Sequence, residues 1–327
     1  MCFETSLSLR IVFEWLNLSI SGMKLVVIGS ITEDIIISPS KKESRYIGGV
    51  PVYAAAIAKA LEESIGIVSK VGTDFHLNNL KTLHSLGPDL RGFKISGESS
   101  MVFENRYTPK GRRVQRLLAT SEKITFSEIP TAYLSISCVH LGPVFNEIPI
   151  ELISQVRKHY KLVSLDAQGF TRSVDKKKGH IVLKSQVDLQ EILPYIDILK
   201  VDDNEIKCLT SSTKLADAIA TVLAFNLDFL IITRAHKGAI IFHHNQRIDI
   251  PAFPTTIVDE TGAGDTFIVA FLLTYLATVD AYYSGLVAAS AASYKIATAG
   301  PFPTYIRDDI LTKVQTFLAT QKHPPTS

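Results

Sequence analysis

The clearest indication of chemistry is a short stretch near the C-terminus, residues 258–267, which reads Val-Asp-Glu-Thr-Gly-Ala-Gly-Asp-Thr-Phe. Gly262 and Gly264 remove two side chains where a bulky anion would have to approach the backbone. An apolar helical pattern begins at Asp265. We therefore expect the N–H groups of Gly262, Ala263 and Gly264 to point outward from a helix N-terminus, where donors lack partners and the dipole is positive. The stretch predicts a phosphate-binding cradle.

Asp265 is expected beside this anion. A carboxylate repels phosphate, so it is a poor choice for simple binding. It suits a general base that accepts the proton of a hydroxyl group attacking the phosphate. The alternative interpretation is that Gly-Ala-Gly forms a tight turn and that Asp265 only caps the following helix.

The composition describes an ordinary globular protein. The 327 residues are 46% hydrophobic and 20% charged, enough for one sizeable domain or two modest ones. A net charge of +2 gives no electrostatic reason to expect a nucleic-acid partner. Cys2, Cys138 and Cys208 are odd in number and widely spaced, which indicates neither a disulfide framework nor a zinc cluster. The reducing cytoplasm is the expected location.

No segment reaches the roughly 20 uninterrupted apolar residues that a membrane span needs, so no membrane association is expected. Residues 1–22 carry Glu4, Arg10 and Glu14 among apolar residues, which is unlike a secretory signal peptide. We interpret them as an N-terminal extension before a functional start at Met23. The alternative is an amphipathic helix that binds a partner.

Strand-length apolar runs alternate with helical stretches along the chain. This pattern predicts a mostly parallel sheet covered by helices on both faces. Ligands bind such sheets at the carboxyl ends of the strands, where the polar residues of this chain fall. The expected strands include residues 25–28, 65–71, 138–141, 162–165, 196–200 and 229–233.

One segment departs from this alternation. Residues 99–120 read as two strands around a Pro-Lys-Gly turn, and with residues 35–47 they are expected to form a small antiparallel sheet that projects from the main body. The alternative is a peripheral hairpin with no role in the site. Its arginines are expected to be mostly solvated: Arg106, Arg112, Arg113 and Arg116.

The wider pattern Asp-x-Thr-Gly-Ala-Gly-Asp-Thr-Phe, followed by an alanine-rich helix, resembles the signature of the ribokinase-like, or PfkB, carbohydrate kinases. The resemblance spans roughly residues 23 to 318, and its landmarks occur in family order. It implies one kinase domain over residues 23–320, with residues 321–327 as a tail. The implied fold is a three-layer α/β/α sandwich with a mostly parallel central sheet and a small β lid over the sugar site.

The resemblance also implies an activity. The family transfers phosphate from ATP, with Mg²⁺, to an alcohol group of a small molecule, and Asp265 is then the general base. A monovalent cation and a homodimer formed through the lid are further features that the family allows. Thr261, at the start of the Gly-Ala-Gly turn, is an expected nucleotide contact.

The substrate-binding landmarks of the family lie near the N-terminus. Asp34 follows a first-strand glycine by five positions and is expected to hydrogen-bond substrate hydroxyls. Gly48 and Gly49 resemble a glycine pair that lets the substrate lie against the backbone. The chain departs from the family at Tyr53, where an asparagine usually contacts the sugar. Tyr53 either stacks on a ring or packs in the core.

Residues 166–172, Asp-Ala-Gln-Gly-Phe-Thr-Arg, are similar to a stretch of the archaeal and plant inositol kinases. In that branch Gln168 would face the substrate. Arg172 would neutralise the transferring phosphoryl group through its planar donors. The alternative is an exposed loop with a surface arginine.

Two further landmarks concern the metal and the nucleotide. Asp202 and Glu205 match Asn-x-x-Glu with an aspartate at the first position, and they imply a Mg²⁺ site that acts through water. The alternative is that the acidic run caps a helix. Thr233 and Gly238 match a nucleotide-binding turn in which Ala235 replaces a glycine. The small-residue helix 285–297 would form one wall of an adenine pocket.

We therefore predict an ATP-dependent kinase of a small sugar or polyol, with inositol-like acceptors favoured and a nucleoside kinase as the alternative within the family. Two other classes of protein are alternatives to a kinase. A nicotinamide-dependent oxidoreductase is disfavoured because the first strand lacks a Gly-x-Gly-x-x-Gly turn. A non-catalytic sugar sensor would not need Asp265.

Overall fold

The computed structural model describes residues 22–322, apart from residues 109–112, 186 and 245. Residues 1–21 of the expected N-terminal extension lie outside this part of the chain, as do the Pro-Lys-Gly turn, Arg112 and the last five residues of the tail. Helix α10, Arg307–Lys322, continues beyond the boundary expected for the domain at residue 320.

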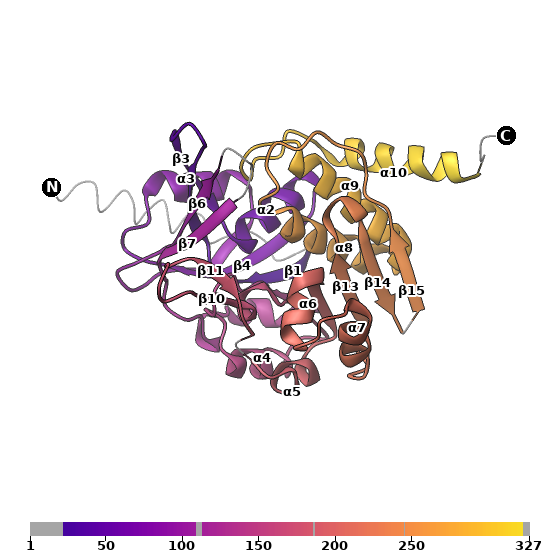
Figure 1. Ribbon diagram of the computed structural model, residues 1–327, viewed down its shortest axis with the longest axis horizontal. Coiled ribbons are helices and arrows are strands. Elements are labelled where there is room, and N and C mark those ends of the chain that lie inside the picture. The colour runs from indigo at the N-terminus through magenta and orange to yellow at the C-terminus, as the bar shows by residue number, and fades with distance from the viewer. Residues whose placement is uncertain (1–21, 109–112, 186, 245, 323–327) are drawn as a thin grey trace.

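The core of the molecule is a nine-stranded sheet with the order β15-β14-β13-β12-β9-β8-β1-β4-β5 (Figure 1). Pairs from β13 through β1 to β5 are parallel, whereas β14 is antiparallel to both β13 and β15. The mostly parallel sheet predicted from the sequence is therefore confirmed. The strands are β1 Met23–Ile28, β4 Ser64–Val71, β5 Asp89–Ile95, β8 Cys138–Leu141, β9 Leu162–Asp166, β12 Ile198–Asp202, β13 Phe229–Thr233, β14 Ala239–His243 and β15 Gln246–Ile250.

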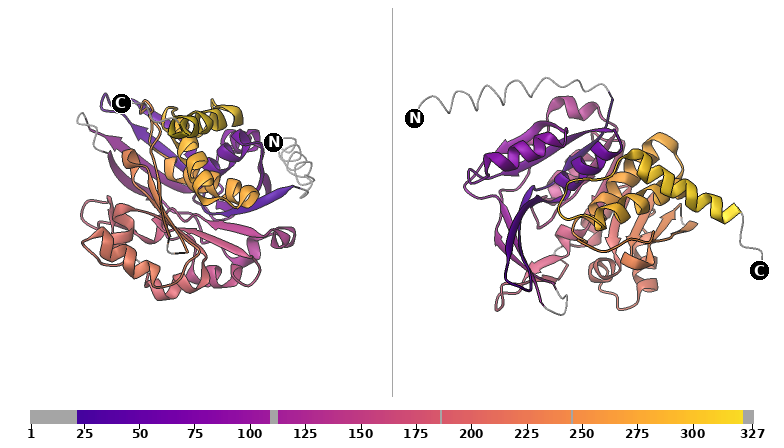
Figure 2. Two further views of the ribbon diagram at one scale, coloured as in Figure 1. Left: turned by 90° about the vertical axis from the view of Figure 1, so that its right-hand side faces the viewer. Right: turned by 90° about the horizontal axis from the view of Figure 1, so that it is seen from above.

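Helices cover both faces of this sheet (Figure 2). The alternation of side chains along β1 shows the two cores: Leu25 and Val27 pack with one group of helices, and Val26 and Ile28 pack with the other. The first group is α2 Val50–Ala60, α3 Leu77–Ser85, α8 Ala263–Thr278, α9 Ala281–Ile296 and α10; the second is α4 Ile150–Val156, α5 Leu189–Ile192, α6 Asp203–Leu209 and α7 Leu215–Leu223. The predicted three-layer α/β/α sandwich is confirmed.

A second sheet of four strands, the lid, projects from the body (Figures 1 and 2). Its order is β3-β2-β6-β7. The two outer pairs are antiparallel, as expected, but the central pair of β2 with β6 is parallel because the intervening chain passes through the main body. The strands are β2 Thr32–Ile37, β3 Glu43–Gly48, β6 Met101–Tyr107 and β7 Arg113–Ala119.

Helix α8 begins at Ala263 rather than at Asp265, with Gly262 as its N-cap residue. Its residues from Asp265 to Leu273 are buried, since α2 and α9 pack against it and β1 lies beneath. The N-terminus of α8 is thereby fixed at the carboxyl edge of the sheet. None of the helices in the described part of the chain has the length and apolar character that a membrane span needs.

Candidate active site

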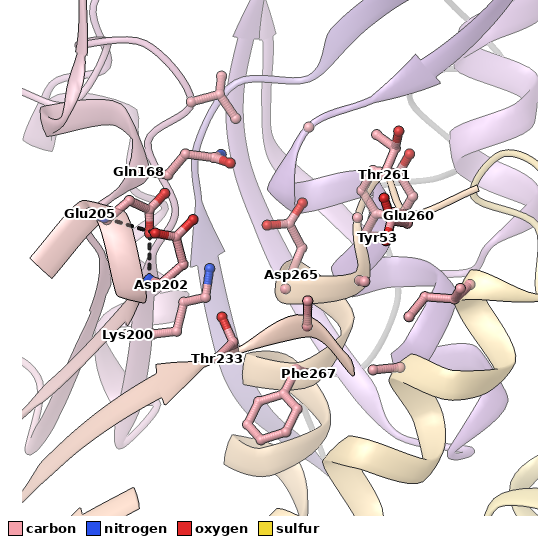
Figure 3. Close-up of a pocket in the computed structure, with 18 of the residues that line it drawn as sticks. Tyr53, Gln168, Lys200, Asp202, Glu205, Thr233, Glu260, Thr261, Asp265 and Phe267 are labelled. Carbon is pink, nitrogen blue, oxygen red and sulfur yellow. Dashed lines mark hydrogen bonds between the residues drawn. The ribbon is translucent and has the colours of Figure 1, made fainter. Parts of the chain in front are cut away.

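One cavity of about 390 Å³ runs along the carboxyl edge of the sheet, between the lid and helix α9. Figure 3 shows Asp265 in its middle, with Gln168, Asp202 and Glu205 on one side and Tyr53 and Thr261 on the other. Most of the residues selected from the sequence line it: Asp34, Gly49, Tyr53, Gln168, Arg172, Asp202, Glu205, Thr233, Gly238, Thr261, Gly262, Ala263, Gly264 and Asp265. Segments from across the whole chain therefore meet at one site.

The cradle at the N-terminus of α8 differs in one donor from the expectation. The N–H of Ala263 donates to the carbonyl oxygen of Glu260 at 3.2 Å, so it is not free for an anion. The N–H groups of Gly262 and Gly264 have no acceptor among the described residues. The first turn of α8 folds back onto Glu260, so only two of the three predicted N–H donors are available. Two backbone donors remain at the positive end of the helix.

Gly262 is required by its surroundings as well as by its backbone. Its φ of 77° lies in the left-handed region, and a Cβ atom there would overlap the ring of Tyr53. Tyr53 is 3% exposed and packs under the cradle. Its core-packing interpretation thus holds, and its ring also contributes to the cavity wall.

Asp265 is buried, and its side chain lies at the centre of the cavity (Figure 3). Burial, and after it the neighbouring Asp166 carboxylate, raise the pKa of Asp265 from 3.8 to about 6 against the opposing charges of Lys200, Arg172 and Lys295. A carboxylate with a pKa near neutrality is a better proton acceptor than an ordinary aspartate and is still ionised at pH 7.

A buried ion pair lies next to the cradle. The Nζ atom of Lys200 is 2.8 Å from Oδ2 of Asp166, and both side chains are almost fully buried. The same Nζ atom would lie 2.9 Å from a Cβ atom on Gly264. The nearby Asp166, Glu205 and Asp265 carboxylates keep Lys200 charged, raising its pKa against the effect of burial. A fixed positive charge therefore borders the expected phosphate position (Figure 3).

Asp202 and Glu205 form the capping interactions that the alternative interpretation described. Oδ1 of Asp202 accepts the N–H of Glu205 at 2.7 Å, and Oε2 of Glu205 accepts the N–H of Asp202 at 2.7 Å (Figure 3). Oδ1 of Asp202 also accepts the N–H of Asn204 at 2.7 Å. This reciprocal capping box begins α6. One oxygen of each carboxylate has no protein partner in the described residues. Burial raises the pKa of Glu205.

The described residues contain no group of three or more His, Cys, Asp or Glu side chains placed to hold a metal ion. The two remaining oxygens of Asp202 and Glu205 face the cavity, however, and hard oxygen donors suit Mg²⁺. The residues therefore fit an ion that is held by phosphate and water with carboxylates outside its first layer of ligands, and they do not form a closed protein cage.

Arg172 begins β10 (Arg172–Val174) and is held firmly. Its guanidinium donates to Oε1 of Gln168 at 2.7 Å and to the carbonyl of Val144 at 3.2 Å, and it lies over the ring of Phe103. The interpretation as an exposed surface arginine is therefore wrong. Oε1 of Gln168 accepts this hydrogen bond, and the amide Nε2 of Gln168 is a donor that a ligand could use.

Asp34 lies on the lid side of the cavity. Burial raises the pKa of Asp34 to about 7, and Arg113 and Arg172 partly oppose this. Gly48 does not line the cavity; it lets the chain pass close to the Asp34 carboxylate, which a Cβ atom would overlap. Gly49, with φ 84°, does line the cavity and is the N-cap residue of α2. The glycine pair thus supports Asp34 and leaves one backbone position open to a ligand.

The opposite end of the cavity lies between β13 and α9. Thr233 ends β13, and Ala235 takes a φ of 48°, the left-handed conformation that the usual glycine would adopt easily. Gly238 allows the turn to pass close to the backbone of Ile250. Small and apolar side chains line this end: Ala252, Phe253, Ala289, Ala292, Ser293 and Ile296. The space suits a flat, largely apolar group.

Sequence reasoning missed two basic residues of the site. Lys200 stands in a strand in which Ile198, Leu199 and Val201 pack in the core, and a lone lysine among such residues is the signal that could have identified it. Arg113, expected to be mostly solvated, is exposed and also lines the lid side of the cavity with Gln115 and Phe103. Only the pairing of β2 with β6 brings these lid residues over Asp34, and no local pattern encodes that pairing.

A doubly covered parallel sheet with a projecting lid, and a buried carboxylate at a helix N-terminus, define a class of small-molecule phosphotransferase. Comparison with known proteins agrees. A family model described as pfkB family carbohydrate kinase matches residues 159–305. The chain is 27% identical over 257 residues to a cytidine kinase of Thermococcus kodakarensis, which covers 77% of this chain and 88% of that protein.

An inositol 3-kinase of Arabidopsis thaliana is 25% identical over 257 residues, 76% of this chain and 67% of that protein. Among solved structures, a sulfate complex of a pyrophosphate-dependent kinase in the ribokinase family superimposes with a TM-score of 0.76 at 25% identity, covering 88% of this chain and 99% of that one. The chain is thus similar to the ribokinase-like PfkB carbohydrate kinases, in sequence and in fold. The kinase prediction is confirmed over the oxidoreductase and sensor alternatives.

Proposed function

We propose that the protein is an ATP-dependent kinase that phosphorylates an alcohol group of a small polyol of the inositol type, with Asp265 as the general base. The observation that carries the proposal is the position of Asp265. It is a buried carboxylate with a raised pKa, it lies in the first turn of α8 beside two unpaired backbone donors, and it faces a cavity that continues to both the lid and α9.

In this mechanism the acceptor lies on the lid side, where the Asp34 carboxylate accepts hydrogen bonds from its hydroxyls. Asp265 takes the proton from one hydroxyl as its oxygen bonds to the terminal phosphorus of ATP. The bond from that phosphorus to the bridging oxygen breaks, and ADP leaves with the electron pair. Asp265 then releases the proton to solvent. The N–H groups of Gly262 and Gly264 stabilise the negative charge on the transferring group.

Two cations of the chain support the same step. Lys200 borders the cradle from the sheet side, and Arg172 lines the cavity near Asp265. Mg²⁺, bound with the nucleotide phosphates and oriented through water by Glu205 and Asp202, would supply further charge neutralisation when present. These positive charges offset the negative charge of the transferring phosphoryl group, while Asp265 receives the proton of the attacking hydroxyl.

The donor is assigned from the other end of the cavity. The small side chains of Ala289 and Ala292 leave room beside Phe253 and Ile296 for a flat base. Thr233 and Gly238 border the path from that space to the cradle. A pyrophosphate donor, as used by the structural relative, would leave this end empty. The apolar lining therefore favours ATP.

The acceptor is assigned from the polar groups of the lid side. Asp34, Gln168 and Gln115 line this end with Arg113 and Arg172 and offer hydrogen bonds in several directions, as a ring bearing many hydroxyls requires. A nucleoside is the second candidate. Phe103 favours it, since this ring lines the same end and could stack on a base.

Phosphate transfer tests the proposal directly. Purified protein is incubated with ATP and Mg²⁺ and, separately, with pyrophosphate, across myo-inositol, pentoses, hexoses, ketodeoxy acids and nucleosides, and phosphorylated product is quantified by mass spectrometry. We expect the highest kcat/KM with ATP and an inositol-type polyol. A preference of tenfold or more for a nucleoside, or for pyrophosphate, would overturn the acceptor or the donor assignment respectively. The Asp265→Asn variant is the control that measures product formation without the proposed general base.

A further inference from the structure

A second buried lysine, Lys295, lies behind the cradle and does not line the cavity. It is 2% exposed and belongs to the last turn of α9. Its Nζ atom donates to the carbonyl oxygens of Asp259 at 3.1 Å and of Thr298 at 3.2 Å, and it lies 3.5 Å from Oδ2 of Asp259. The ring of Tyr53 closes a further side, with its centroid 5.7 Å away.

These contacts hold the segment that leads into the cradle. The two oxygens of the Asp259 carboxylate accept the N–H of Thr261 at 2.9 Å and the N–H of Gly300 at 3.2 Å. The N–H groups of Val258 and Asp259 both donate to the carbonyl of Ile296 at the end of α9. The segment 258–261 is thus fixed to the end of α9, and Thr261 directly precedes the N-cap residue of α8.

The atoms around Nζ form a set of two carbonyl oxygens and one carboxylate. Buried oxygens of this kind repel one another and cost free energy unless a positive charge lies among them. Carbonyl and carboxylate oxygens are also the donors that replace the hydration shell of a hard cation such as K⁺. A chain could meet this need with an ion taken from solution. This chain meets it with a tethered ammonium group.

We propose that Lys295 is a positioning residue, a built-in cation that fixes the cradle segment and makes the activity independent of monovalent cations in solution. The inference rests on the proposed kinase function. It predicts that removing the ammonium leaves an oxygen-lined space that a monovalent cation of suitable size can occupy.

The test compares the wild type with Lys295→Ala in potassium, ammonium and choline chloride at equal ionic strength. Choline is too large for the space and serves as the inert salt. We expect the wild type to turn over at rates within twofold in all three salts. Lys295→Ala should lose at least tenfold in kcat in choline and recover several-fold in potassium or ammonium.

Melting temperature supplies a readout that needs no substrate. The melting temperature of Lys295→Ala should rise in potassium or ammonium relative to choline, while that of the wild type stays constant. The melting-temperature measurement remains a valid test even if the acceptor proves to be another molecule. Lys70→Ala is the matched control, because Lys70 is also a buried lysine, paired with Glu128 and a backbone carbonyl away from the cradle. Its loss should show no cation dependence.

Three results would overturn the proposal. The first is a wild-type enzyme that requires potassium or ammonium, which is decisive even if no variant folds. The second is a Lys295→Ala variant whose turnover equals that of the wild type in choline. The third is a loss of turnover that neither cation relieves, with no salt-specific change in melting temperature; Lys295 would then serve packing alone.

Discussion

At the scale of single residues, the site is set by charges that are removed from water. Lys200 is the side chain whose role the sequence conceals most. Its ammonium forms a buried ion pair with Asp166 and borders the cradle at Gly264. A preorganised charge at the transferring group contributes roughly 10²–10³ to turnover in sites of this kind. We therefore expect Lys200→Met to lower kcat by about that factor, measured as the rate of ADP release at saturating substrates.

Loss of the ammonium alone would leave the Asp166 carboxylate buried and unpaired, which destabilises proteins by several kcal/mol. The double variant Lys200→Met with Asp166→Asn also removes the unpaired buried charge. It should regain melting temperature without regaining turnover. If turnover returns together with stability, Lys200 serves the fold only.

At the scale of elements, the decisive junction is the turn that begins α8. Gly262 combines a left-handed backbone with direct contact to the Tyr53 ring. Gly262→Ala must displace either the ring or the turn, so we expect at least a tenfold loss of kcat, measured by ADP release, with a lower melting temperature.

Gly87 provides the matched control for this variant. It follows α3 with φ 81°, and a Cβ atom there would meet nothing within 4 Å. Gly87→Ala should destabilise the fold only through its left-handed backbone, by about 1–2 kcal/mol, and should keep wild-type turnover. Equal turnover of Gly262→Ala and Gly87→Ala would mean that the cradle geometry does not depend on Tyr53.

At the scale of the whole molecule, the buried Asp265 carboxylate serves the proposed activity but lowers the free energy of unfolding. Its pKa rises from 3.8 to about 6 on folding, mainly through burial. Between these values the folded chain holds a proton that the unfolded chain has lost, so the free energy of unfolding decreases as pH rises, and the full cost is present above about pH 6. Asp265→Asn avoids this cost, which is on the order of 1–3 kcal/mol.

We therefore expect Asp265→Asn to melt a few degrees above the wild type at pH 8, with the gain shrinking toward pH 4. Scanning calorimetry at both pH values checks this. A variant that melts below the wild type at pH 8 would show that the buried carboxylate stabilises the fold there.

The fold was largely predictable because its signals are local. Apolar runs marked the strands of the parallel sheet, and β8 and β13 have the bounds expected from the sequence. The cradle was also visible in residues 261–265. Three features could not be predicted. They are the parallel orientation of β2 and β6, the pairing of Lys200 with Asp166, and the oxygen atoms around the ammonium group of Lys295. Each arises from segments that meet only in the folded chain, so no spacing along the sequence reveals them.

The most direct test of the account is the turnover of Asp265→Asn at pH 8 with saturating ATP, Mg²⁺ and the best acceptor, alongside calorimetric measurement of nucleotide binding. If Asp265 accepts the hydroxyl proton, the variant stays folded and binds nucleotide as the wild type does, but its kcat is lower by roughly 10²–10⁴. A folded Asp265→Asn variant with wild-type kcat would contradict the central claim.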